Sequence, residues 1–120
     1  EGFGLAPAEM MYLGKPVIAT DWSANTDFMN ADNSMPVRYT LQALQQPVGV
    51  YPAGQLWAEA DTDHAAWCLT RLLDDAELRQ HTGAKAAAAI RSQLSPQTVG
   101  ALVRQRLAMI GMWRPDLRVV

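Results

Sequence analysis

Length, composition and charge describe one folded domain and exclude several classes of protein. The 120 residues are typical of a single domain, and 49% hydrophobic content with 18% charged residues is enough to build a core, which excludes a disordered chain. A net charge of −2 lacks the clustered basic surface of a nucleic-acid-binding domain, so we expect no nucleic-acid partner.

The chain opens on a glycine-rich turn between two carboxylates. Gly2 and Gly4 let the backbone approach a ligand closely, and Pro7 suits the first position of a helix. The free N–H groups and the dipole of that helix favour an anion such as a pyrophosphate. Glu1 and Glu9, when ionised, accept hydrogen bonds from sugar or ribose hydroxyls. The segment therefore predicts recognition of a phosphate beside a polyol.

A two-turn helix is predicted between Pro7 and Gly14, followed by a short strand over residues 17–20. The strand is β-branched and continuously apolar, which is typical of a buried parallel strand and favours half of a doubly wound sheet. The apolar side chains that we expect this helix to turn toward a core are Met10, Met11 and Leu13.

Polar residues follow the strand at its carboxyl end, where open α/β sheets place their ligand crevice. We expect Asp21, Trp22 and Asp27 to line a site there. For Asp27 an equal alternative is that it caps a helix beginning near residues 25–27. Residues 30–60 are rich in proline and glycine and predict short strands and loops, with residues 56–59 returning to the sheet as an edge.

The second half of the chain is predicted to be helical. Asp61 or Thr62 caps a first helix, and Asp74, with Glu77 three residues on, caps the next one. Gly83 is expected to break or kink that second helix.

Ser95 caps a last helix, with Pro96 in its first position. Its apolar stripe needs a partner surface and consists of Val99, Leu102, Val103, Leu107 and Ile110.

The histidines and the cysteine predict no metal centre and no nucleophile. His64 and His81 lack neighbouring ligands at metal-binding spacing, and Cys68, in mid-helix, is interpreted as a core residue. A single cysteine agrees with a reducing compartment, so we expect a cytoplasmic protein. A peripheral contact with an anionic membrane surface is a further alternative, carried by Arg104, Arg106, Arg114 and Arg118.

The ordered features of residues 1–29 resemble the C-terminal domain of retaining nucleotide-sugar glycosyltransferases of family 4, which have the GT-B architecture. Glu1 and Glu9 match the family's spacing of two glutamates, and Gly-Phe-Gly-Leu, Leu-Gly-Lys-Pro and Val-Ile-Ala-Thr follow in the same order. Residues 56–90 are similar to the closing helices of such domains. The resemblance implies an α/β fold, a partial Rossmann-like domain with short parallel strands and closing helices. Residues 1–120 would be the second half of that domain, inactive without the N-terminal acceptor domain.

The same resemblance implies a role for each residue of the opening turn. Glu1 would hold the transferred sugar as the catalytic candidate, and Glu9 would bind the ribose of the donor. Sugar and pyrophosphate would be bound by the backbone of Gly2, Phe3, Gly4 and Leu5. Transfer would retain configuration with assistance from the donor phosphate, so no metal and no cofactor are expected. The partners implied are a nucleoside diphosphate sugar and a sugar, glycan or lipid-linked acceptor, as in polysaccharide biosynthesis.

Two other classes of function stay open. One is a different GT-B enzyme, either a sugar-nucleotide epimerase or a glycogen-synthase-like polymerase; the other is a non-catalytic Rossmann-like interaction module. A dinucleotide fingerprint is not among them, since Pro7 stands where its third glycine belongs. Within the resembled family, the irregular stretch from residue 30 to residue 60 is interpreted either as an insertion near the acceptor or as a surface hairpin.

Overall fold

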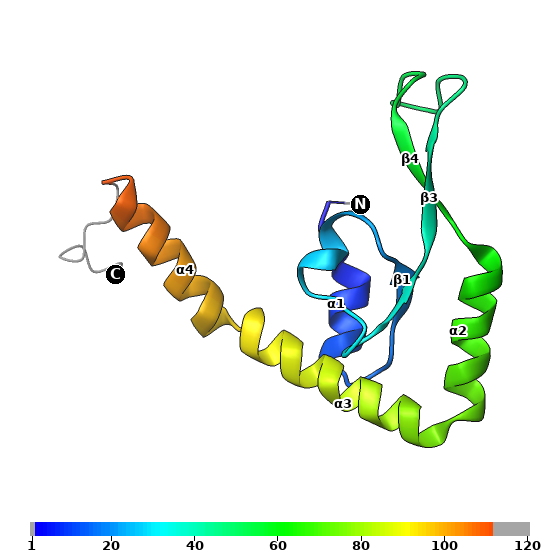
Figure 1. The fold of residues 1–120 in the computed structure, drawn as a ribbon. Coiled ribbons are helices and arrows are strands. Elements are labelled where there is room, and N and C mark those ends of the chain that lie inside the picture. The colour runs from blue at the N-terminus through cyan, green and yellow to red at the C-terminus, as the bar shows by residue number, and fades with distance from the viewer. Residues whose placement is uncertain (1, 112–120) are drawn as a thin grey trace.

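The computed structural model describes residues 2–111 of the chain, as a mixed α/β fold (Figure 1). The helices are α1 (Leu5–Tyr12), α2 (Thr62–Asp74), α3 (Ala76–Gln93) and α4 (Pro96–Met109). The strands are β1 (Ile18–Thr20), β2 (Met35–Val37), β3 (Tyr39–Ala43) and β4 (Leu56–Ala60), and a 3₁₀ helix, η1 (Ser23–Asp27), joins β1 to β2.

The strands form two separate pairs. β1 and β2 are parallel, with Ile18 opposite Met35, which agrees with the parallel strand expected over residues 17–20. β3 and β4 form an antiparallel hairpin, with Tyr39 opposite Ala60, and Figure 1 shows this hairpin projecting away from the helices. The prediction that residues 56–59 return to the first sheet is therefore wrong. β4 pairs with β3 because a hairpin brings together strands that are close in sequence.

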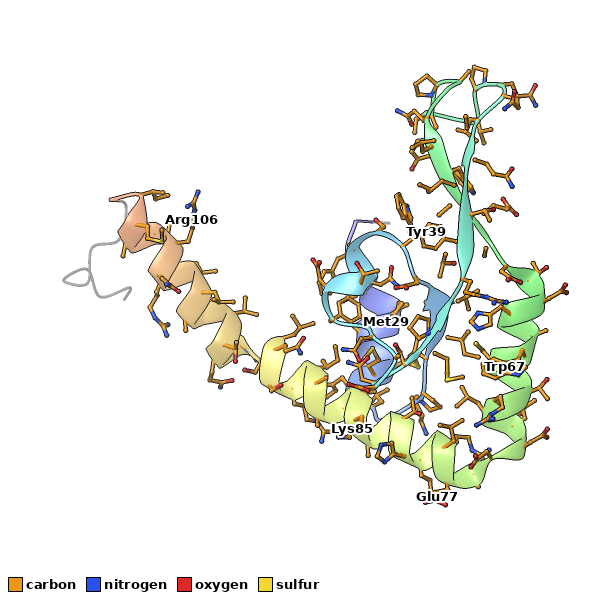
Figure 2. All side chains as sticks on the ribbon, in the orientation of Figure 1. Met29, Tyr39, Trp67, Glu77, Lys85 and Arg106 are labelled. Carbon is orange, nitrogen blue, oxygen red and sulfur yellow. The ribbon has the colours of Figure 1, made fainter. Side chains whose placement is uncertain are left out.

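The main core lies where α1 packs against α3. Figure 2 shows Met29 in this central region, among side chains from several elements. Met11 is fully buried, as expected, but Met10 and Leu13 are 43% and 60% exposed, so their predicted burial is wrong. α1 buries only the stripe of Ala8 and Met11, and neighbouring helical positions point about 100° away from it. The buried cluster consists of Ala8, Met11, Val17, Phe28, Met29, Ala86 and Ile90.

Gly83 neither breaks nor ends α3, which runs unbroken from Ala76 to Gln93. A Cβ atom at Gly83 would lie 2.2 Å from the carbonyl oxygen of Gly14, at the turn after α1. The expected break at Gly83 is therefore wrong, since α3 is continuous there. This glycine allows the backbones of α3 and of the turn after α1 to touch.

The helix caps agree with the sequence in two of three places. Asp61 and Ser95 each accept a hydrogen bond from the backbone N–H three residues on, at 2.8 and 3.1 Å, and Pro96 is the first residue of α4. The cap of α3 is Asp75 and not Asp74, because α2 continues through Asp74 and the backbone becomes extended only at Asp75.

α4 continues outward from the end of α3 and leaves the body of the molecule (Figure 1). The radius of gyration is 18.5 Å, whereas about 14 Å is expected for a compact domain of this length. None of the residues of α4 is buried, and four of the five residues of the predicted apolar stripe are exposed: Val99, Leu102, Val103 and Ile110.

Candidate functional site: a glycine-capped helix end beside a neutral aromatic cleft

No side chain caps the N-terminus of α1. Its cap residue is Gly4, which has left-handed backbone angles (φ 86°, ψ 51°) and supplies no side chain to the helix. α1 begins at Leu5, so Pro7 is its third residue. The prediction that Pro7 is the first residue of the helix is therefore wrong. The first closing bond runs from the N–H of Ala8 to the carbonyl of Gly4, at 3.1 Å. The N–H groups of Leu5 and Ala6 precede that bond and, like those of any first turn, have no helical carbonyl to bind.

The other predicted donor-binding residues surround this helix end or lie outside the described part of the chain. Glu1 lies outside residues 2–111. Gly2 and Phe3 are exposed in the approach to α1, with the ring of Phe3 lying 5.2 Å from the buried ring of Phe28. Glu9 is exposed on α1, one turn beyond Leu5. The binding roles of Glu1 and Glu9 stay predictions.

A cleft of about 540 Å³ lies at the carboxyl end of β1, between the start of α1 and the hairpin. This size is within the range of small-molecule sites. One wall contains Gly4, Pro7, Thr20, Trp22 and Asn25. The other wall comes from the hairpin and contains Leu44, Tyr51, Gln55, Leu56, Trp57 and Ala58. Among the described residues that line the cleft, none carries a charge at neutral pH.

Two hydrogen bonds to one carbonyl stabilise the loop after β1 beside the cleft. The side-chain amide of Asn25 donates to the carbonyl of Thr20 at 2.9 Å, and the backbone N–H of Trp22 donates to the same carbonyl at 2.8 Å. Ser23 has a φ of 73°, a left-handed conformation that costs energy for any residue except glycine. Trp22 packs against Tyr39 at the base of the hairpin, with the ring centroids 5.2 Å apart. The loop thus presents Trp22 to the cleft.

Of the residues expected to line a site after β1, only Trp22 lines this cleft. Asp21 and Asp27 are exposed outside it. η1 ends at Asp27, so the alternative that Asp27 caps a helix is wrong. Asp21 contributes its backbone N–H to the sheet, donating to the carbonyl of Val37 at 2.9 Å.

The hairpin residues of the cleft could not be assigned to a site from the sequence. Tyr51 and Trp57 are the aromatic members, and their rings meet edge to face at 6.1 Å. The available signal was the occurrence of two exposed aromatics and an amide, Gln55, in a stretch otherwise rich in proline and glycine. The pairing of β3 with β4 is what brings them opposite Trp22.

The pair of His64 and Cys68 does not form a nucleophilic centre. The Nε2 of His64 and the Sγ of Cys68 are 3.9 Å apart, but the thiol is buried, and this burial raises its pKa. A buried thiol with a raised pKa stays protonated and is a poor nucleophile. The Nδ1 of His64 accepts a hydrogen bond from the backbone N–H of Arg38 at 3.1 Å, which gives it a structural role. Cys68 is a core residue, as the sequence predicts.

Two kinds of feature are absent from residues 2–111. No group of three or more histidine, cysteine, aspartate or glutamate side chains is placed to hold a metal ion. No helix there is long and apolar enough to span a bilayer.

Comparisons with protein-family models, with curated proteins and with solved structures each found no match for this chain.

Proposed function

We propose that residues 1–120 form the second half of the nucleotide-sugar-binding domain of a retaining GT-B glycosyltransferase. The observation that carries the proposal is the glycine-capped, open N-terminus of α1 at the carboxyl end of β1. An anion is stabilised by free N–H groups and by the helix dipole at such a position. Ligands of open α/β sheets also bind beyond the carboxyl ends of the strands.

In this proposal the donor diphosphate lies at the start of α1. The backbone of Gly2, Phe3, Gly4 and Leu5 provides N–H groups to the pyrophosphate and the transferred sugar, as preorganised charge stabilisation. Gly4 allows the left-handed backbone of this turn, where a Cβ atom would lie 3.6 Å from both Asn25 and Phe28. Glu1 holds hydroxyls of the transferred sugar, and Glu9, which is exposed one turn along α1, accepts hydrogen bonds from the ribose.

The parallel pair of β1 and β2 would be part of a larger Rossmann-like sheet. Parallel sheets are normally covered on both faces, and helices α1, α2 and α3 all belong to the body that contains this pair. The remaining strands and the acceptor domain would be supplied by preceding residues of a longer polypeptide.

The test is donor binding and transfer by the complete polypeptide in which these residues stand. A panel of UDP-, GDP-, ADP- and TDP-sugars is screened by ligand-observed NMR, and the anomeric configuration of any product is determined. We expect one nucleotide class to bind and the product to retain configuration. Binding of no sugar nucleotide would refute the proposal and favour a non-catalytic module, whereas turnover of the donor without an acceptor would favour an epimerase.

A further inference from the structure

The aromatic cleft has the composition of a site for a neutral ligand. Trp22 and Trp57 lie on its two walls and are 40% and 44% exposed, so part of each ring is open to a ligand. The side-chain polar groups of the lining residues are uncharged: the amides of Asn25 and Gln55, the hydroxyls of Thr20, Ser23 and Tyr51, and the indole N–H groups of Trp22 and Trp57. Apolar and aromatic surface with a few polar groups is typical of small-molecule sites.

The absence of charge from the described lining residues argues against a phosphate in the centre of the cleft. A nucleoside diphosphate carries negative charges that proteins usually meet with arginine, lysine or a helix N-terminus. Only one end of this cleft, at Gly4, touches such a terminus. The opposite wall, which contains Tyr51, Gln55 and Trp57, offers flat apolar faces and an amide.

A sugar ring matches the chemistry of these surfaces. Its C–H groups form an apolar face that can lie on an indole ring, and its hydroxyls are both donors and acceptors for amides. Both tryptophans are positioned by contacts within the protein, since Trp22 packs against Tyr39 and Trp57 packs against Tyr51. A ligand that binds between them does not have to order these rings itself.

We propose that this cleft binds an uncharged sugar ring of the glycosyl acceptor, with Trp22 and Trp57 as its two stacking surfaces. The hairpin β3–β4 is then an acceptor-recognition arm. The assignment of this sugar as an acceptor rests on the proposed function, because an acceptor requires a donor at the start of α1. The binding of a neutral sugar in the cleft does not depend on that assignment.

The experiment measures binding of neutral methyl glycosides to the complete polypeptide by saturation-transfer NMR, with methyl glucuronide as the anionic comparison. We expect at least one neutral glycoside to bind. Its Kd should rise at least tenfold in both Trp22→Ala and Trp57→Ala, and the uncharged ring should bind better than the glucuronide. UDP, GDP, ADP and TDP should not displace the glycoside.

Trp67 provides the matched control. It is 52% exposed on α2, where it stacks on His64, and it does not line the cleft (Figure 2). Trp67→Ala should leave the Kd within twofold of the parent value. Gln55→Ala, which changes an exposed side chain on the hairpin, should raise the Kd severalfold without changing the fold, as far-UV circular dichroism would check.

Three results would overturn the proposal: no binding of any neutral glycoside, equal binding by the parent and by Gln55→Ala and Trp57→Ala, or weaker sugar-nucleotide binding in Trp57→Ala. The last result would assign the cleft to the donor sugar. Glycoside binding that is lost in the tryptophan variants, in a protein that binds no nucleotide, would refute the transferase function and leave the sugar cleft standing.

Discussion

The two glutamates of the opening turn have different jobs in the proposed mechanism, so their variants should fail differently. Glu9→Ala removes a charge-assisted contact to the ribose worth about 1.5–3 kcal/mol in ground and transition states alike. Donor KM should rise about ten- to a hundredfold while kcat changes little. Glu1→Ala misplaces the reacting sugar and should lower kcat more than it weakens donor binding.

Steady-state kinetics of the complete polypeptide over donor concentration separate these two effects. Asp27→Ala serves as a control, since Asp27 is exposed and lies outside the cleft. Nearly parental kcat/KM in both glutamate variants would mean that these carboxylates are only solvated surface, and the site assignment would have to be abandoned.

The close contact between Gly14 and Gly83 leads us to expect that a larger residue at position 83 destabilises the protein. Gly83→Ala places a methyl group 2.2 Å from the carbonyl oxygen of Gly14, and the two backbones must separate. We expect the free energy of unfolding to fall by about 1–3 kcal/mol, measured by urea titration, because this overpacking outweighs the better helix propensity of alanine.

Gly100, in the middle of α4, is the matched control. A Cβ atom there would meet only the guanidinium of Arg104, at 3.6 Å. Gly100→Ala should therefore be neutral or stabilise the protein, by up to about 1 kcal/mol. Equal effects of the two substitutions would show that the close approach at Gly83 costs nothing to disturb.

These residues also mark the limit of what the sequence can predict at this scale. Caps such as Asp61 and Ser95 were predicted because the signal and its partner lie within four residues. The role of Gly83 depends on a residue 69 positions away, Gly14, and a glycine inside a helix pattern indicates only a weak point. The interpretation of Gly83 as a helix breaker used local sequence alone, whereas the structure gives this glycine a tertiary contact.

At the scale of elements, the start of α2 depends on a charged cap. Asp61 accepts the N–H of His64 at 2.8 Å and pairs with Arg38 at 3.0 Å. The bond from the backbone of His64, with a smaller contribution from Arg38, lowers the pKa of Asp61 below its usual value of 3.8. The charged carboxylate therefore favours the folded state. Its stabilisation is complete above pH 3.8 and is lost as the pH falls through the lowered pKa.

Asp61→Asn tests this pH dependence because asparagine can also cap a helix but carries no charge. We expect the variant to melt at a lower temperature than the parent at pH 7, and the two melting curves to converge as the pH falls below 3.8. Glu59→Gln removes the same charge from an exposed position on β4 and should lack this convergence. A difference between Asp61→Asn and the parent that is constant from pH 7 to pH 2 would exclude the charged cap.

The elements themselves could be predicted where their signal is local. The helices and β1 follow from caps, prolines and apolar runs, and the structure contains them. The pairing of β4 was not predictable in the same way, because residues 56–59 suit any strand edge. Both interpretations of residues 30–60 agree with a hairpin, and only its position beside Trp22 gives it a candidate role.

At the scale of the whole molecule, composition predicted a core but not the distribution of apolar surface. Part of that surface lies on α4 and on the hairpin, which both extend away from the body (Figure 1). Composition counts apolar residues without saying where they face. The apolar stripe of α4 was visible in the sequence as a need for a partner, and residues 2–94 leave most of it exposed.

The exposure of α4 leads to a prediction about local stability. A helix of 14 residues is marginal in water by itself, and α4 buries none of its side chains, whereas α3 buries Ala86 and Ile90 in the core. Amide hydrogen exchange in the isolated 120-residue chain should therefore be at least about a hundredfold faster in α4 than around Ala86 to Ile90, because α4 can open without disturbing the core. Exchange is measured by mass spectrometry of peptides from each helix.

The complete polypeptide gives a second test. If a second domain stands beside this chain, as proposed, and covers Val99, Leu102 and Val103, exchange in α4 should become slower while exchange in the core of α3 stays unchanged. Equal protection of α4 and α3 in the isolated chain would mean that the exposed stripe is covered in solution, by self-association or by refolding onto the body, and sedimentation would separate these two cases.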